Sequence, residues 1–303
     1  MFEDIIGNQK TKEILKRTII SNKASHSYMF IGTEGIGKKL IAKEFAKAIL
    51  CLSSDKHEAG SYCGTCKSCI EFTSSNNPDF IYIEPEENKI KIDQIRTMQT
   101  KVAEKPIISQ NKVYIINDAD TMTHEAQNCL LKTLEEPPEY VTIILIGKTE
   151  ENFLTTIRSR CAKIHFDKIS NEDLKEYLIK NEITEISEDL LQMADGSIKK
   201  ALEINENKES YYSLEKIMNN IDKCDIIEIL NLSAELYKSK ETINSILENI
   251  SIIALKKSRE NVKFARCIKV VEETKSRLKA NGNYDMCIDN LLFGMWREVN
   301  WKI

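Results

Sequence analysis

A glycine-rich segment near the N-terminus has the residue types and spacing of a phosphate-binding loop. Gly32, Gly37 and Lys38 form the pattern G-x4-G-K, with Gly35 between them, after an apolar run and before a helical pattern. In such a loop, successive backbone N–H groups converge on an anion at the start of a helix, and the lysine adds a positive charge. Spacing and context together favour a phosphate cradle over a simple glycine turn.

Two residues in and beside this loop argue against ATP hydrolysis. ATPases carry a Ser or Thr after the loop lysine, because its hydroxyl binds Mg²⁺. Here that position is Lys39, whose ammonium group repels a cation. Glu34 adds a carboxylate inside the loop, which disfavours phosphates unless it points outward. The sequence therefore predicts no Mg²⁺ site at the loop and leaves ATP binding open.

The end of a later apolar run has lost its magnesium ligands in the same way. In P-loop ATPases this strand supplies an Asp to the metal shell and a second residue that orients the attacking water. The run here ends in Asn117 and Asp118, followed by Ala119. Asn117 is a neutral amide where a carboxylate is expected, and a shift that gives Asp118 the metal role leaves Ala119 as the base. We therefore expect both contacts to be compromised.

Four clustered cysteines predict a structural zinc site. They are Cys51, Cys63, Cys66 and Cys69, the last three in C-x2-C-x2-C spacing. In a reducing compartment clustered cysteines indicate metal rather than disulfides, and four thiolates suit a closed tetrahedral zinc. Gly64 eases the tight turn, and the metal holds a module at about 51–69 that has little core of its own. The alternatives are reduced core cysteines without metal, or His57 in place of one ligand.

The elements that position these residues alternate between strands and helices in the first half of the chain. Expected strands are 27–32, 80–85, 112–118 and 141–147, and expected helices include 38–51, 92–105 and 124–138. This alternation predicts a parallel, doubly wound α/β sheet. From Asn171 onward the pattern is helical. The five single cysteines are expected to be small core residues; they are Cys129, Cys161, Cys224, Cys267 and Cys287.

Length and composition allow two or three domains and exclude a strongly basic protein. The 303 residues include 43 basic and 47 acidic side chains, for a net charge of −4. No global positive field draws the chain to nucleic acid, so any DNA contact must be local or shared with partners. The sequence has no run of 18 apolar residues and starts without signal-peptide features. We therefore expect a cytoplasmic protein that makes no contact with a membrane.

Several segments, in order along nearly the whole chain, together resemble the clamp-loader branch of the AAA+ proteins. Besides the phosphate loop and the cysteines, they are FEDIIGN (2–8), HSYMF (26–30), IDQIR (92–96), LLKTLEEPP (130–138) and SRC (159–161). The resemblance implies a RecA-like AAA+ P-loop domain at 1–167 with an inserted zinc knuckle. It further implies a small helical lid at 168–210 and an all-α collar for oligomerisation at 211–303.

Within this family, the residues at the ATP-binding positions are more typical of the delta-prime type than of the hydrolysing tau/gamma type. The family's Gly-Ser-x-Arg lid signature ends here in Lys199, and the sensor position falls near Lys148. The resemblance thus implies a subunit that is no enzyme by itself, within a holoenzyme that has DNA-directed DNA polymerase activity. The alternative is a tau/gamma-like ATPase that tolerates these substitutions. An unrelated P-loop kinase is disfavoured, because the SRC and cysteine segments would then be coincidences.

Arg160, in the SRC segment, is the candidate catalytic residue, acting in trans. In the family this arginine reaches the ATP of a neighbouring subunit; the alternative is a solvated surface arginine. The resemblance implies a stator bound to tau/gamma and delta subunits in a hetero-pentamer, which loads the sliding clamp on primer-template DNA. Arg96, Lys101 and Lys105 lie on a helix that faces DNA in the family, but solvated helix charges explain them equally well. Glu135 and Glu136 are expected to be solvent charges at a helix end.

Overall fold

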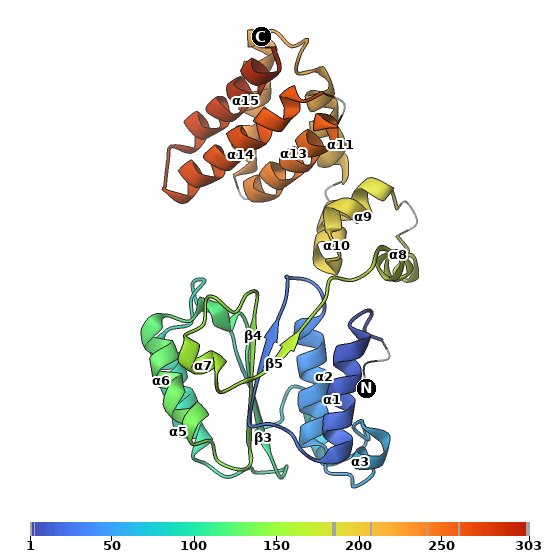
Figure 1. Ribbon diagram of the computed structural model, residues 1–303, viewed down its shortest axis with the longest axis vertical. Coiled ribbons are helices and arrows are strands. Elements are labelled where there is room, and N and C mark those ends of the chain that lie inside the picture. The colour runs from blue at the N-terminus through green and yellow to red at the C-terminus, as the bar shows by residue number, and fades with distance from the viewer. Residues whose placement is uncertain are drawn as a thin grey trace. The chain divides into compact units, whose positions relative to one another are not determined.

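The computed structural model describes residues 2, 4–183, 186–206, 208–240, 242–259 and 261–300. Glu3 of the opening segment therefore lies outside the described residues. The chain divides into two compact units, Met1–Ala201 and Leu202–Ile303 (Figure 1). The division at 167 and 210 implied by the family resemblance stays a prediction. In the described part of the chain no helix is long and apolar enough to cross a membrane.

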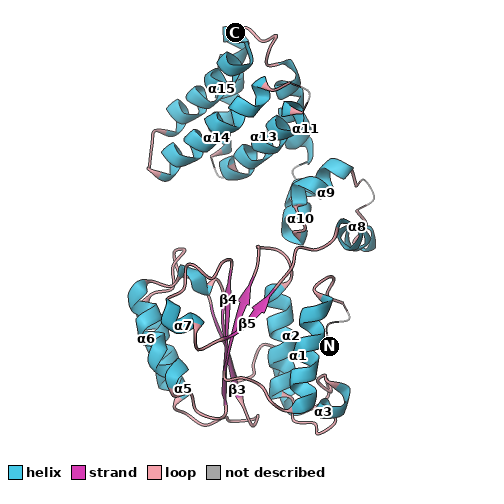
Figure 2. Ribbon diagram, in the orientation of Figure 1, coloured by secondary structure: helices cyan, strands magenta, loops and turns pink. Residues whose placement is uncertain are grey.

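The first unit is built on a five-stranded parallel sheet in the order β2-β3-β4-β1-β5 (Figure 2). Its strands are β1 (Ser27–Ile31), β2 (Phe80–Ile83), β3 (Lys112–Ile116), β4 (Val141–Gly147) and β5 (Ala162–His165). The predicted doubly wound α/β fold is confirmed. Four of the strands fall where the sequence predicts them. The fifth, β5, was not predicted because only Ile164 is buried in it, so it lacks the apolar pattern that marks the others.

Helices cover both faces of this sheet, with α1 and α2 on one side and α5 and α6 on the other (Figure 1). Their bounds are α1 Gln9–Ser21, α2 Lys38–Leu50, α3 Lys56–Ala59, α4 Lys67–Thr73, α5 Ile92–Val102, η1 Ala119–Thr121, α6 His124–Glu135 and α7 Thr155–Arg158. Helix α5 ends at Val102 rather than at residue 105. Pro106 disfavours the helical conformation of Lys105, so the helix stops short of the prediction.

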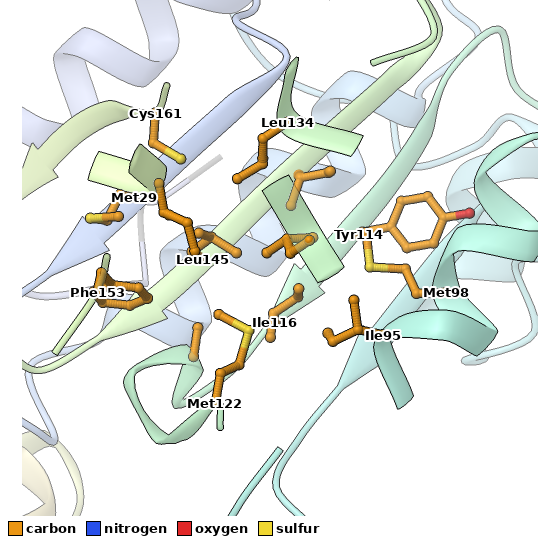
Figure 3. Close-up of a cluster of buried hydrophobic side chains, with 14 of the residues drawn as sticks. Met29, Ile95, Met98, Tyr114, Ile116, Met122, Leu134, Leu145, Phe153 and Cys161 are labelled. Carbon is orange, nitrogen blue, oxygen red and sulfur yellow. The ribbon is translucent and has the colours of Figure 1, made fainter. Parts of the chain in front are cut away.

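A cluster of buried apolar side chains joins the sheet to α5 and α6 (Figure 3). Strands contribute Met29, Tyr114 and Leu145, and the helices add Met98 and Leu134 among others. β3 and β4 are buried along their whole length, as expected for central parallel strands covered on both faces. This packing holds the carboxyl ends of β1, β3 and β4 in fixed register, which positions the loops that follow them.

The remaining described helices follow the sheet. They are α8 Asn171–Lys180, α9 Glu188–Ala194, α10 Ile198–Glu206, α11 Lys208–Asn220, α12 Ile226–Leu236, η2 Tyr237–Ser239, α13 Ile243–Ser258, α14 Lys263–Lys279 and α15 Tyr284–Asn300. The described part of the second unit is therefore helical. In it α14 and α15 pack closely, because a Cβ on Gly294 would lie 2.8 Å from Val270 Cγ1.

The five single cysteines lie in both units. Cys161, Cys267 and Cys287 are buried, as predicted for small core residues. Cys129 and Cys224 are only half-buried. Cys129 still packs against the core cluster of the first unit.

Candidate functional site

The predicted phosphate loop joins β1 to α2, as the sequence indicated. Lys38 begins α2 and is buried. Its ammonium group donates hydrogen bonds to the carbonyl oxygens of Gly32 at 2.5 Å and Thr33 at 2.6 Å. Burial lowers the pKa of Lys38, and the carboxylates of Asp118 and Asp120 oppose that shift. The loop lysine therefore satisfies two carbonyls of its own loop.

Lys39 lies beside an aromatic ring of β2. Its Nζ is 4.8 Å from the centroid of the Tyr82 ring, a cation–π distance, and Lys43 lies at 5.2 Å from the same ring. The hydrogen bond with Tyr82 raises the pKa of Lys39, so the residue stays charged. A charged lysine thus occupies the position from which a hydroxyl would bind Mg²⁺. Sequence reasoning missed Tyr82, although its strand was predicted.

The residues after β3 present a short acidic turn. Asn117 donates its side-chain N–H to the Asp118 carboxylate at 2.9 Å, and Ala119 is buried. Burial raises the pKa of Asp118, and the negative charges of Asp120 and Glu34 add to the shift. Asp120 is a site residue that the sequence analysis missed; its carboxylate accepts the backbone N–H of Lys148 at 3.2 Å.

Glu34 lies between two lysines from other elements. Its carboxylate is 2.8 Å from Nζ of Lys148, after β4, and 2.5 Å from Nζ of Lys199, in α10. Hydrogen bonds to Lys148 and then Lys199 lower the pKa of Glu34 to about 2. The backbone of α10 also reaches the loop, because the N–H of Ile198 donates to the carbonyl of Gly35 at 2.9 Å. Glu34 of the phosphate loop therefore joins the predicted sensor position, Lys148, to the predicted lid signature, Lys199.

The opening segment lies against the same loop. The side-chain amide of Asn8 donates to the carbonyl of Ile36 at 3.4 Å and to that of Asp167 at 3.2 Å. Its side-chain oxygen accepts the backbone N–H of Asp167 at 2.8 Å. A Cβ on Gly37 would lie 3.5 Å from Ile5 Cγ2. Asn8, in the FEDIIGN segment (2–8) that resembles the family, thus links the loop to the chain that follows β5.

The four predicted zinc ligands converge in the structure. The sulfur atoms of Cys51, Cys63, Cys66 and Cys69 all lie within 4.8 Å of one another. Cys51 Sγ is 3.6 Å from Cys63 Sγ and 4.0 Å from Cys66 Sγ. Tetrahedral zinc with Zn–S bonds of about 2.3 Å places its sulfurs about 3.8 Å apart, so the cluster has the right dimensions. Gly64 adopts a φ of +78° in the turn, a conformation that favours glycine.

The surroundings of the cluster suit thiolates. Backbone N–H groups of Cys63 and Leu52 donate to the sulfurs of Cys51 and Cys66 at 3.4 and 3.5 Å. Lys56, whose ammonium group donates to the carbonyl of Cys51 at 2.7 Å, places a positive charge beside the sulfurs. His57 instead contacts the carbonyl of Ile19 through Nδ1 at 2.8 Å. The residues present therefore fit a zinc site made of the four cysteines, without His57.

The cysteine module is joined to the sheet by polar contacts. Ser68, in α4 beside the ligands, has its hydroxyl 2.9 Å from that of Ser109. Asn77 donates its side-chain N–H to the Ser68 carbonyl at 3.0 Å, and its side-chain oxygen accepts the N–H of Asp79, just before β2. All four side chains are buried. A metal bound to the cysteines would therefore also support the edge strand β2.

Arg160 lies between α7 and β5, at the amino ends of the strands. Its carbonyl accepts the hydroxyl hydrogen of Ser27, the first residue of β1, at 2.6 Å. Its guanidinium group pairs with Glu135 at 2.8 Å and donates to the carbonyl of Thr156 at 2.9 Å. The side chains of Arg160 and Glu135 are 34% and 49% exposed. Glu135, expected to be only a solvent charge, is thus the partner of Arg160.

The predicted DNA-facing charges are divided between a helix and the chain after it. Arg96 and Lys101 lie in α5 and Lys105 lies beyond its end. Arg96 pairs with Asp93 at 3.3 Å, and both side chains are exposed. A contact with DNA stays a prediction for these residues.

Comparison with known proteins identifies relatives for most of the chain. Residues 7–170 match a family model described as DNA polymerase III, delta subunit. The chain is 31% identical to DNA polymerase III subunit delta' of Bacillus subtilis over 209 residues, covering 69% of this chain and 62% of that protein. It is 33% identical to DNA polymerase III subunit tau of Bacillus subtilis over 210 residues, covering 67% of this chain and 37% of that protein. The matched region is therefore less than two thirds of either relative.

A solved structure extends the likeness over nearly the full length. A DNA polymerase III gamma subunit-related protein from Thermotoga maritima superposes with a TM-score of 0.53 at 23% identity, covering 95% of this chain and 99% of that one. At this identity the likeness concerns the fold.

Proposed function

Since the chain belongs to the DNA polymerase III delta-subunit family, among the clamp-loader AAA+ subunits, we propose that it is a delta-prime-type subunit. In this role it helps to load the sliding clamp on primed DNA, donates Arg160 to a neighbouring ATP site and hydrolyses no ATP itself. Its relatives include both delta-prime and tau subunits at similar identity, so the choice between the types rests on the residues of the site.

The observation that carries the proposal is the arrangement at the phosphate loop. Lys39 stands in place of the magnesium-binding hydroxyl and lies against Tyr82. Asn117 replaces the expected carboxylate and is hydrogen-bonded to Asp118. Mg²⁺ normally bridges the β- and γ-phosphates and neutralises the charge that develops on them. Without its ligands, the loop lacks the means to hydrolyse ATP.

The position of Arg160 supports a role in trans. The phosphate loop follows the last residue of β1, whereas the carbonyl of Arg160 is bonded to Ser27, the first residue of that strand. The arginine and the chain's own loop therefore lie at opposite ends of β1: the arginine at the amino ends of the parallel strands, which we call the amino edge of the sheet, and the loop at their carboxyl ends, the carboxyl edge. Arginine offers a rigid fork of donors that suits phosphate oxygens. An exposed arginine remote from its own loop is best placed to serve another subunit's ATP.

The partners and location follow from this role. We expect tau/gamma and delta subunits in a hetero-pentamer in the cytoplasm, with the clamp and primer-template DNA reached through the complex. The net charge of −4 means that any DNA contact is local. The four cysteines would hold a structural zinc, which supplies a fixed crosslink between the end of α2 and α4.

The experiment that tests the arginine is Arg160→Ala in the full chain, reconstituted with its tau/gamma and delta partners. The ATPase activity stimulated by primed DNA and clamp should fall, while Arg158→Ala, at the end of α7, is the matched control. Unchanged stimulated activity in Arg160→Ala would reject the role in trans. ATP turnover by the purified chain alone would instead support the tau/gamma-like alternative.

A further inference from the structure

We propose that Glu34 closes the phosphate loop from within: its carboxylate bridges Lys148 and Lys199 and holds residues 197–199 on the loop without nucleotide. This inference rests on the proposed function and deepens it. In an ATPase the bound nucleotide would join these segments, whereas here the carboxylate of Glu34 joins them without nucleotide. It concerns the isolated chain and requires nothing of Arg160.

The charges come from three separate segments. Glu34 lies in the loop after β1, Lys148 follows β4, and Lys199 lies in the first turn of α10. Two lysines aimed at a phosphate loop normally serve the oxygen atoms of a bound polyphosphate. Here both ammonium groups lie within 2.8 Å of one carboxylate. An anion of the chain itself thus occupies the position between the two cations.

The backbone contact beside this bridge is direct. The N–H of Ile198 donates directly to the carbonyl of Gly35. A Cβ on Gly35 would lie 2.2 Å from Ser197 Oγ and 2.7 Å from Lys199 Cβ. Ser197 is itself buried, and its hydroxyl accepts the N–H of Lys200 at the start of α10. The start of α10 therefore packs straight onto the loop.

The loop lysine is directed inward as well. Both hydrogen bonds described for Lys38 go to carbonyls of the loop, Gly32 and Thr33. A polyphosphate entering the loop would have to replace these bonds and displace the carboxylate of Glu34. Because the pKa of Glu34 is about 2, the carboxylate is ionised at neutral pH and repels a phosphate. The carboxylate of Glu34 would therefore both hold residues 197–199 on the loop and disfavour the binding of a polyphosphate.

A surface ion pair without consequence is the competing explanation. The three side chains are between 46% and 55% exposed, and exposed pairs usually contribute little to stability. The two explanations differ at the Ile198 amide, because only under a lock does the protection of that hydrogen-bonded N–H depend on Glu34. Amide exchange reports such local opening directly.

The test measures hydrogen exchange, corrected for intrinsic rates, in the nucleotide-free full chain, comparing wild type with Glu34→Gln and Lys199→Gln. Exchange at the Ile198 amide should be about tenfold faster in both variants, as expected when a local lock is opened. Exchange at the Ile143 amide, which donates to His26 within the sheet, should stay the same and verifies that each variant is folded.

Glu150→Gln is the matched control. Glu150 bridges Lys163 at 2.5 Å and His165 at 3.2 Å, so it also joins two basic side chains, but both belong to β5. Its removal should change Ile198 exchange by less than about twofold. Equal exchange at Ile198 in wild type and Glu34→Gln, with the sheet intact, would overturn the proposal.

A binding measurement provides a second readout. ATP without added metal is titrated into wild type and Glu34→Gln, and the variant should bind at least about tenfold more tightly, because a like charge has been removed. Equal affinity would overturn the proposal. Neither result depends on the assembled loader, so failure here is distinguishable from failure of the Arg160 role.

Discussion

The two edges of the parallel sheet differ in what their basic side chains contact. At the carboxyl edge, Lys38 bonds to loop carbonyls, and Lys148 and Lys199 bond to Glu34. At the amino edge, Arg160 pairs with the exposed Glu135 and keeps a third of its side chain open to solvent. At both ends the cations pair within the chain, but Lys148 and Lys199 pair with a residue of the phosphate loop, whereas Arg160 pairs with a residue of α6. Under the proposed function, this fold has lost its own chemistry at the carboxyl ends of the strands and keeps a contribution to a partner at their amino ends.

The sharpest way to break this comparison is Arg160→Lys. Lysine keeps the charge but not the fork of donors that matches phosphate oxygens. If Arg160 completes a neighbouring ATP site, that site should lose about 10³-fold or more in hydrolysis rate. Single-turnover hydrolysis in the reconstituted loader measures this. A lysine variant as active as wild type would mean that a positive charge alone is sufficient at the amino edge.

Removing metal from the cysteine module tests how far the stability of the whole first unit, rather than of either end of its strands, depends on the four cysteines. Chelation should release one zinc per chain and lower Tm by roughly 5–10 °C, because local folding energy is lost. Metal analysis and thermal unfolding record both changes. Cys129→Ser, outside the cluster, is the control. A Tm unaffected by chelation, or a preparation without zinc, would contradict the assignment.

Glu135→Gln tests whether the outward arginine is held ready by its partner. An exposed ion pair contributes about 0–1 kcal/mol, so the expected change in stimulated ATPase is at most about fivefold. We expect this change in the rate of ATP hydrolysis by the complex when it is stimulated by clamp and DNA. Glu136→Gln, at the residue just after α6, should leave the rate unchanged. Equal effects of both substitutions would show that Glu135 has no special role.

The smallest expected effect concerns acid at the carboxyl edge. The pKa of Glu34 is lowered to about 2 from an ordinary value of 4.5 by Lys148 and Lys199. A depressed pKa stabilises the folded state fully above 4.5, and this contribution is lost as pH falls through about 2. Protection of the Ile198 amide, corrected for intrinsic exchange, should therefore change by less than about twofold between pH 7 and pH 4.5. Loss of protection near pH 6 would point to another group.

Sequence patterns predicted the features of the fold and the site that depend on residues close together in the chain. The strand at 141–147 has the predicted bounds, because its continuous apolar run is typical of a central parallel strand. The convergence of the four cysteines could also be predicted from the sequence, because all four lie within a short stretch of the chain. Helix α5 was predicted three residues too long, because a periodic pattern alone does not mark where a helix ends.

Contacts between distant segments were not accessible from the sequence. Glu34 and Lys199 are separated by 165 positions, and no local pattern relates them. The pairing of Glu135 with Arg160 depends on how α6 and the turn before β5 pack. The sequence analysis recognised Glu34 as unusual in its loop, but only the fold shows which cations it meets.

The hydrogen bond between Ser27 and the carbonyl of Arg160 also fixes where Arg160 lies relative to the phosphate loop. It places the arginine at the first residue of the strand whose last residue precedes the phosphate loop. Five residues of parallel strand span about 13 Å, and this strand is buried along its whole length. The spacing between the two positions is thus set by rigid backbone. Under the proposed function, a neighbouring subunit would receive an arginine held at a fixed distance from this chain's loop.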